Sequence, residues 1–384
     1  MNLDDEFVSQ SFVKGTRIYL NNASSSLIPI NTMKAMTDFT MQYNTLGPDS
    51  LDFATLLAEK NILLRKSLSK LLRCRPEEIV LTQSTTEGIN AVASGMSFPK
   101  NSNIIIRGTT HEHHSNYYPW LRLAKQVDLR SLPVDQDGFF DIEDLQRIID
   151  TNTRLVTLSH GLYNTGAILP AEQIGKVLKE KGITYFLDAA QTVGCIGDYD
   201  FTKIGADFIV FNGYKWLCGP MGIGILVCKK ESAGLLEPMQ LAGESAILYD
   251  TNKLAYKELP DRLQGGFRNF VAVAGLEASV SFLLHLGLDN IRKRIIGLAD
   301  LLRQELANIP SITLYGPVDR EKRTSIVSFS HAERNPQQIV ESFEKQKIVL
   351  AVREISDKKI VRVAPHFFNT ESEILATVDA IKKL

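Results

Sequence analysis

Cysteine is scarce in this chain, with four residues among 384. No two of them form a Cys-x-x-Cys pair, so the sequence predicts neither a disulfide framework nor a cysteine zinc site, and it fits a reducing compartment. The chain also lacks an apolar run of about 20 residues, the length that a transmembrane helix requires. Its first residues, Met1 to Glu6, are acidic and lack the apolar core of a signal peptide. We therefore expect a cytoplasmic protein without a membrane partner.

An excess of charge of one sign is also missing. The 43 lysines and arginines nearly balance the 44 aspartates and glutamates, which gives a formal net charge of −1. Because a nucleic-acid-binding domain usually carries a basic excess, we expect no nucleic acid as a partner. With 44% hydrophobic residues, the chain has enough apolar material for the cores of two domains.

Apolar stretches of strand length alternate with helical patterns between residues 75 and 230. This alternation predicts an α/β fold with a large domain around a mainly parallel sheet. Helical spacing over residues 269–308 and further strand patterns after it predict a smaller α+β domain, so we divide the chain into 1–268 and 269–384. Residues 235–264 have weak periodicity and several glycines and prolines, which favours a loop-rich segment of the active site. The predicted strands are Ile79–Thr82, Asn103–Arg107, Leu155–Ser159, Ile183–Leu187, Phe208–Phe211, Gly224–Cys228, Ile312–Tyr315, Thr324–Ser330 and Ile360–Ala364.

Lys215 follows the strand pattern Phe208–Phe211 after a short polar turn. At a strand end beside aromatic residues, partial burial disfavours the ammonium form and leaves an amine that can act as a nucleophile. Such amines form Schiff bases with carbonyls, including the aldehyde of pyridoxal phosphate. A solvated surface lysine is the simpler interpretation of this residue alone. Three further patterns, all of which precede Lys215 in the chain, favour the cofactor.

Asp188 ends the strand pattern Ile183–Leu187 and is therefore expected at the carboxyl edge of the sheet, where open α/β folds bind ligands. A carboxylate there can keep the pyridine nitrogen of pyridoxal phosphate protonated, which makes the ring a better electron sink. The alternative role is to cap the following helix. Because Lys215 follows on the next strand, we interpret Asp188 as the partner of the cofactor ring.

A strand pattern leads into a helical pattern near Ser84. Ser84 and Glu87 have the spacing of a capping box, which predicts that a helix begins there. The backbone N–H groups of a helix start, together with the hydroxyls of Thr85 and Thr86, form a cradle suited to one phosphate group.

His111, His113 and His114 lie close together in the sequence. No Cys-x-x-Cys or His-Glu-x-x-His pattern accompanies them, so we expect no metal site. An imidazole that stacks on a flat cofactor ring and moves protons near neutral pH fits this cluster better.

Together these patterns resemble the class V aminotransferases, in the branch with cysteine desulfurases, selenocysteine lyases, isopenicillin-epimerase-like proteins and kynureninases. The resemblance runs from Tyr19-Leu-Asn-Asn-Ala-Ser to Gly224 and returns at Val361 to Glu371. It implies pyridoxal 5'-phosphate as the cofactor and the fold type I architecture of pyridoxal-phosphate-dependent transferases. It also implies a homodimer with the cofactor at its interface and a small amino acid as the substrate.

The resemblance implies a role for each matching residue. Lys215 would carry the cofactor as an imine, and His113 would stack on its ring and act with Lys215 in catalysis. Asp188 and Gln191 would hold the pyridine nitrogen and the ring hydroxyl. Arg362 would clamp the substrate carboxylate. The implied cofactor-binding residues are Thr85, Thr86, His113, Asn164, Asp188, Gln191, Asn212, Tyr214 and Lys215, and the implied substrate-binding residues are Arg362, Asn164 and Arg353.

Two segments depart from the family pattern. Cysteine desulfurases of the family carry a nucleophilic cysteine on a loop between two C-terminal arginines, whereas Arg353 and Arg362 are separated only by Glu-Ile-Ser-Asp-Lys-Lys-Ile-Val. A persulfide-forming cysteine must reach the substrate sulfur, so this chain is expected to lack one. The Gly-Thr-Pro-Asn segment, with which a neighbouring subunit contacts the phosphate, appears as Gly266-Phe267-Arg268-Asn269. Whether Arg268 replaces the threonine is open.

We therefore predict a pyridoxal-phosphate enzyme that acts on an amino acid through an external aldimine on Lys215. The favoured reaction is desulfurase-like cleavage of the C–S bond of cysteine or a cysteine derivative, without a persulfide cysteine of its own. Transamination and epimerisation begin with the same proton loss at Cα, so both stay open. A non-catalytic scaffold is the remaining alternative.

Overall fold

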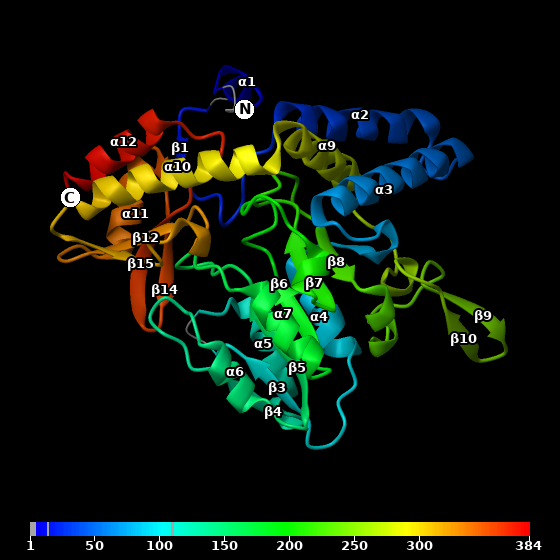
Figure 1. Cartoon of the computed structure of the whole chain (residues 1–384). Helices are drawn as coiled ribbons and strands as arrows, with labels where there is room; N and C mark the ends of the chain where they lie inside the picture. Colours follow the sequence, from blue (N-terminus) through cyan, green and yellow to red (C-terminus); the bar gives the residue numbers. More distant parts are fainter. Residues whose placement is uncertain (1–4, 14, 109–110) are drawn as a thin grey trace.

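The computed structural model describes residues 5–13, 15–108 and 111–384, and its centre is a seven-stranded sheet (Figure 1). The strand order is β2-β8-β7-β6-β5-β3-β4. β8 is antiparallel to β2 and β7, and the other neighbouring pairs are parallel, as the alternation of patterns predicted. The strands are β2 (Ile79–Thr82), β3 (Asn103–Ile106), β4 (Asp128–Ser131), β5 (Thr153–Ser159), β6 (Thr184–Asp188), β7 (Phe208–Asn212) and β8 (Gly224–Cys228).

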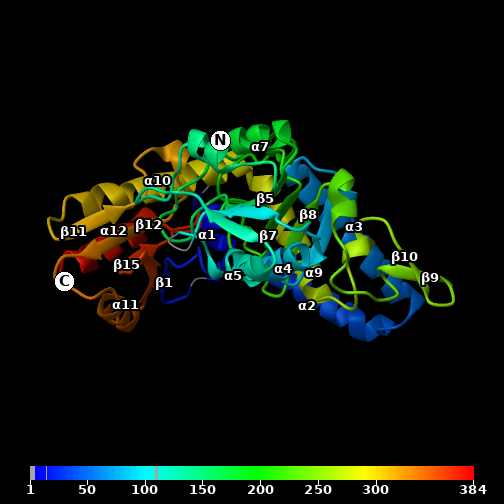
Figure 2. The ribbon, with the colours of Figure 1, turned by 90° about the horizontal axis from the view of Figure 1, so that it is seen from below.

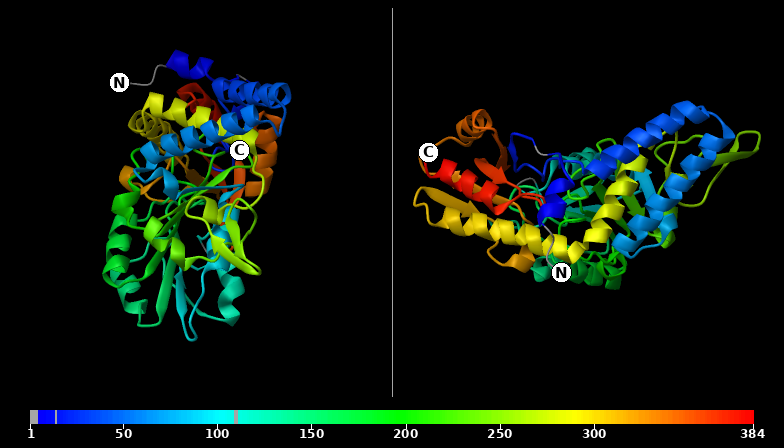
Figure 3. Two further views of the ribbon diagram at one scale, coloured as in Figure 1. Left: turned by 90° about the vertical axis from the view of Figure 1, so that its right-hand side faces the viewer. Right: turned by 90° about the horizontal axis from the view of Figure 1, so that it is seen from above.

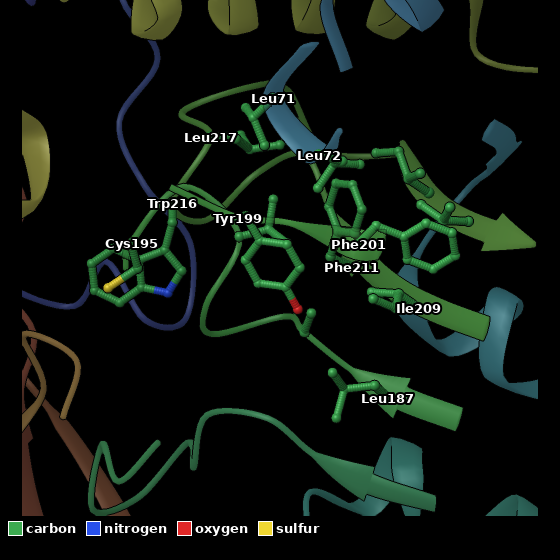
Figure 4. Packing of buried hydrophobic residues seen from close by; sticks show 14 of the residues in the cluster. Leu71, Leu72, Leu187, Cys195, Tyr199, Phe201, Ile209, Phe211, Trp216 and Leu217 are labelled. Carbon is green, nitrogen blue, oxygen red and sulfur yellow. The ribbon is translucent and has the colours of Figure 1, made fainter. Parts of the chain in front are cut away.

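Helices cover both faces of this sheet because successive strand side chains enter opposite cores. Leu155 packs in a core with α4 and α5, whereas Val156 packs in a core with α3, α7 and α8. Figure 4 shows part of the second core, into which Trp216 and Leu217 turn immediately after Lys215. The helices around this sheet are α2 (Ile30–Leu46), α3 (Leu51–Leu72), α4 (Thr85–Gly95), α5 (Tyr118–Leu121), α6 (Ile142–Ile148), α7 (Ala171–Glu180), α8 (Phe201–Ile204) and α9 (Phe270–Leu286).

A smaller antiparallel sheet, in the order β11-β12-β15-β14, lies at one end of the molecule (Figure 2). Helix α10 bends away from α9 at Gly287 and packs beside α12, as the view from above in Figure 3 shows. Helices α10 and α12 share a core with the small sheet. The elements are α10 (Leu288–Ala307), β11 (Ile312–Tyr315), β12 (Val327–His331), α11 (Pro336–Lys345), β13 (Ile348–Val349), β14 (Ala351–Ile355), β15 (Lys358–Val363) and α12 (Glu371–Ile381).

The N-terminal arm, residues 18–26, runs between the two sheets. Its strand β1 (Ile18–Tyr19) pairs in parallel with β13, and Asn21 forms a bridge with Ala364 just after β15. Helix α1 (Asp5–Gln10) precedes it, and the Phe12 ring packs against the Phe368 ring, with centroids 4.4 Å apart and the planes tilted by 38°. Although the arm lies first in the sequence, it therefore pairs with C-terminal segments, with β13 in a separate two-stranded sheet and with the residue that follows β15.

The structure differs from the sequence prediction in residues 235–264. Part of this segment is a hairpin of β9 (Ala246–Asp250) and β10 (Lys253–Tyr256) rather than a loop, and it projects from the body (Figure 1). Helix α9 shares a core with the large sheet, together with Ile291 and Ile295 of α10. The division of the chain at residue 268 stays a prediction.

Among the described residues, no single helix is both long and apolar enough to cross a membrane. Helices α9 and α10 meet that criterion of length and composition only as a pair, bent by 82°.

Candidate active site

One pocket lies where the parallel strands β5, β6 and β7 end. Ser159, Asp188 and Asn212 are the last residues of these strands, so the fold itself gathers their side chains at one edge. Of the residues predicted to bind the cofactor, only Asn164 does not line this pocket. The lining residues are Thr85, Thr86, His113, Ser115, Ser159, Gly161, Tyr163, Asp188, Ala190, Gln191, Asn212, Tyr214 and Lys215.

Helix α4 begins at the pocket, as the capping residues predicted. The Ser84 hydroxyl accepts a hydrogen bond from the Glu87 backbone N–H at 3.1 Å. The Glu87 carboxylate bonds the N–H of Gln83, one residue before the cap. Strand β8 can approach this helix start because Gly224 has no Cβ, which would lie 2.4 Å from the Ser84 carbonyl carbon. Thr85 and Thr86, the first two residues of α4, line the pocket, so the helix start and both hydroxyls lie at the pocket.

Asn212 fixes the turn that carries Lys215. Its side-chain oxygen accepts the Lys215 backbone N–H at 3.1 Å, and its amide donates to the Thr85 hydroxyl at 3.2 Å. The same side chain therefore ties the lysine turn to the start of α4.

Lys215 and Asp188 lie close enough for each charge to affect the other. Burial lowers the pKa of the lysine amine and raises the pKa of the Asp188 carboxyl, so desolvation favours the neutral form of both. One Asp188 oxygen accepts the Ala190 N–H at 2.9 Å. The other makes no hydrogen bond with a residue in the described part of the chain. This carboxylate is thus available to a cationic partner in the pocket.

His113 lines the pocket, and its backbone N–H donates to the carboxylate of the buried Glu112 at 3.3 Å. The ring Nδ1 accepts the Ser115 N–H at 3.2 Å, and the Tyr163 ring lies at 89° to the imidazole with the ring centroids 5.1 Å apart. Burial, reinforced by the charge of Lys215, lowers the pKa of His113 to about 4, so the imidazole is neutral. Glu112 accepts hydrogen bonds from the N–H and hydroxyl of Ser159.

Gln191 lines the pocket with both ends of its amide already bonded. The amide donates to the Ala23 carbonyl at 2.9 Å and accepts from the Trp216 indole N–H at 2.9 Å. Its side chain therefore joins the N-terminal arm to the segment that follows Lys215. The predicted bond with a ring hydroxyl stays a prediction.

Asn164 lies behind the pocket wall and is fully buried. Its amide donates to the Glu354 carbonyl of β14 at 2.8 Å, and its oxygen accepts the Thr165 N–H at 2.9 Å. The structure thus brings it to the small sheet, and its predicted contact with cofactor and substrate stays a prediction.

Arg353 and Arg362 extend from β14 and β15 toward the pocket and share one hydroxyl. The Ser24 oxygen accepts from Arg353 Nη2 at 2.5 Å and from Arg362 Nη2 at 2.6 Å. Arg362 also donates to the carbonyl of Tyr163, a lining residue, at 2.8 Å. Neither guanidinium forms a salt bridge with a carboxylate in residues 5–13, 15–108 or 111–384. Two cations without a counter-ion beside a lysine make a site for a carboxylate.

The segment between these arginines is a tight hairpin. Ile355 pairs with Lys358, so only Ser356 and Asp357 turn the chain, and Ser356 has a φ of 51°. Cys218, the cysteine nearest to Lys215 in sequence, is fully buried against His366 Nε2 at 3.4 Å, and burial raises the pKa of its thiol to about 12. None of the four cysteines lines the pocket.

The pocket residues fit the chemical groups of pyridoxal phosphate. A helix start with two hydroxyls suits a phosphate, a buried carboxylate suits a protonated ring nitrogen, and a desolvated amine suits an aldehyde.

Sequence patterns had not indicated Ser115, Ser159, Tyr163 or Ser24. Ser24 lies within the Asn-Asn-Ala-Ser stretch of the resemblance, but its partners are 329 and 338 residues away in sequence, beyond any local pattern.

Comparison with known proteins identifies the family. The model of the family "Aminotransferase class-V" matches residues 18–375. A probable cysteine desulfurase of Pyrococcus abyssi is 30% identical over 96% of this chain and 94% of its own. The apo structure of the cysteine desulfurase from Thermococcus onnurineus has a TM-score of 0.91 and 26% identity, covering 98% of this chain and 97% of that one.

A further solved structure shares the fold at lower identity. The complex of a cystine C–S lyase with its reaction product cysteine persulfide has a TM-score of 0.89 at 23% identity, covering 96% of this chain and 98% of that one. The predicted fold class, enzyme class and cofactor are confirmed, and the chain belongs to the aminotransferase class-V family of pyridoxal-phosphate enzymes.

Proposed function

We propose that this protein binds pyridoxal phosphate covalently through Lys215 and cleaves the C–S bond of cysteine or a cysteine derivative. The observation that carries the proposal is one pocket in which a desolvated lysine and a buried aspartate lie beside two guanidinium groups without a carboxylate partner. The relatives named probable cysteine desulfurases support cysteine as the substrate class.

Five of the pocket residues have a defined part in this reaction. Thr85, Thr86 and the start of α4 hold the phosphate, and Asp188 holds the proton on the ring nitrogen. When bound, the cofactor supplies an electron sink that acidifies the substrate Cα–H. Lys215 Nζ accepts that proton, since burial lowers its pKa and keeps part of it as the free amine. The neutral ring of His113 would pack on the bound cofactor.

The sulfur leaves without capture by a cysteine of this chain. The short turn at Ser356 and Asp357 has no cysteine, and the raised pKa of Cys218 keeps its sulfur a thiol, a weak nucleophile. β-Elimination satisfies this constraint: the Cα proton moves to Lys215, and the C–S electron pair leaves with the sulfur. Overall, cysteine and water give pyruvate, ammonia and hydrogen sulfide, so no oxidant or reductant is required.

We expect purified holoenzyme with L-cysteine or L-cystine, and no added thiol, to form pyruvate. Cys218→Ser should retain the activity within about twofold, because a hydroxyl can replace the thiol beside Ser26 and His366. Pyruvate, alanine, keto acid and sulfide are measured in parallel for both proteins. Alanine with a protein persulfide that is lost in Cys218→Ser would reverse the proposal. A keto acid that still carries the sulfur of the substrate, formed together with the aminated cofactor, would indicate a transaminase instead.

We also propose a cytoplasmic homodimer. Large apolar side chains are exposed on α2, on α3 and on the β9–β10 hairpin, and exposed apolar surface of this kind marks protein interfaces. Light scattering should give twice the chain mass of 42.8 kDa, and a value near one chain mass would contradict the dimer. The exposed apolar side chains on α2, α3 and the hairpin are Met33, Met41, Tyr43, Ile62, Leu63, Ile247, Leu248, Tyr249 and Leu254.

A further inference from the structure

The hydroxyl of Ser24 joins three groups of the site. It accepts hydrogen bonds from Arg353 Nη2 at 2.5 Å and from Arg362 Nη2 at 2.6 Å, and it donates to Asn21 Oδ1 at 2.8 Å. A serine hydroxyl has one donor and two acceptor lone pairs, so Ser24 uses its whole hydrogen-bonding capacity here. The orientation of the Ser24 hydroxyl is therefore coupled to both of its arginine contacts.

The two arginines require such a bridge. Arg362 is 1% exposed, and burial together with the charge of Arg353 lowers its pKa. Two like charges at a shared oxygen repel each other, and no carboxylate in the described part of the chain pairs with either of them. None of the residues that the structure describes accepts a hydrogen bond from the buried Arg362 Nε. Arg362 also donates to the Tyr163 carbonyl and to Asn21 Oδ1, and the neutral oxygen of Ser24 is the acceptor that both cations share.

The position of Ser24 is set by bonds on each side of it. The Ala23 carbonyl accepts from Gln191 at 2.9 Å, and the Ser26 N–H donates to the Tyr214 carbonyl at 2.8 Å, beside Lys215. Toward the small sheet, the Ala364 N–H donates to the Leu20 carbonyl at 2.7 Å. The arm therefore fixes Ser24 with respect to both the lysine turn and β15.

We propose that Ser24 is a positioning residue, which holds the guanidinium groups of Arg353 and Arg362 in convergent geometry for the α-carboxylate of the substrate. This inference rests on the proposed function, because it assumes that an amino acid binds beside Lys215. Its consequence is that the N-terminal arm takes part in selecting α-amino acids over simple amines.

The test compares binding of L-alanine with binding of ethylamine, which lacks the carboxylate. Cofactor-loaded protein is titrated with each, and the dissociation constant is taken from the change in cofactor absorbance. Ser24→Ala should raise the constant for L-alanine about tenfold, the effect of one charge-assisted hydrogen bond, and leave that for ethylamine unchanged. Ser24→Thr, which keeps the hydroxyl, should restore binding to within about twofold of the wild type.

Ser25→Ala is the matched control, because its hydroxyl makes no hydrogen bond with any residue that the structure describes. It should bind both ligands like the wild type. Equal weakening of L-alanine and ethylamine in Ser24→Ala, or no change in either, would overturn the positioning role. If the wild type forms no product from sulfur amino acids but still binds L-alanine through its carboxylate, the proposed function fails while this inference stands.

Discussion

Lys215→Ala should abolish C–S cleavage and covalent attachment of the cofactor together. The lysine is proposed both to bind the aldehyde and to accept the Cα proton, so its loss removes two functions at once. A general base alone contributes about 10²- to 10⁴-fold, and we expect kcat to fall by at least about 10³-fold. Borohydride reduction followed by peptide mass spectrometry should show a cofactor adduct on the peptide that contains Lys215 in the wild type and none in the variant.

Lys203→Ala is the matched control, since this lysine lies exposed on α8. It should keep both the adduct and the activity. A reduced adduct on another lysine of the Lys215→Ala protein, formed with full activity, would refute the assignment.

Arg362→Lys should weaken binding of amino-acid substrates with little effect on simple amines. Arginine presents a planar fork of N–H groups that can bind both oxygens of a carboxylate, whereas an ammonium group cannot reproduce this geometry. The lost charge-assisted bonds predict a KM for L-cysteine raised about tenfold to hundredfold. The measurement is KM for L-cysteine beside the dissociation constant for ethylamine, which has no carboxylate.

Arg303→Lys controls for the exchange of arginine by lysine at a half-buried site. Arg303 donates to the carbonyls of Tyr315 and Gly316 in the small domain. Its variant should leave KM unchanged. If Arg362→Lys weakened the binding of L-cysteine and of ethylamine equally, Arg362 would be a structural residue of β15 and not the carboxylate anchor.

The residues at the strand ends could be predicted because their positions follow from local sequence. Asp188 and Lys215 each follow a short apolar run, and parallel strands bring such positions to the same edge of the sheet. Ser84 likewise carries the local signal of a helix start. The strands predicted in the large sheet agree with the structure within about two residues, since buried strands give uninterrupted apolar patterns.

Elements at sheet edges and contacts between distant segments could not be predicted. Strand β4 ends its sheet with Asp128-Leu-Arg-Ser, and β14 ends the other with Ala351-Val-Arg-Glu-Ile, so neither has a continuous apolar run. The contacts of Ser24 and the two ends of the Gln191 amide depend on how the arm folds back between the sheets. No periodicity within the chain encodes such contacts.

The two-residue turn between β14 and β15 also bears on how related chemistries can be exchanged. Its residues form no part of either core, and the cost of closing a longer loop there grows by only about 0.6 kcal/mol for each doubling of length. A segment bearing a thiol could therefore be added at Ser356 without altering the strands that carry Arg353 and Arg362. Under the proposed function, retention of sulfur on the protein and its release to solvent would differ by one surface insertion, and this turn is the place to engineer it.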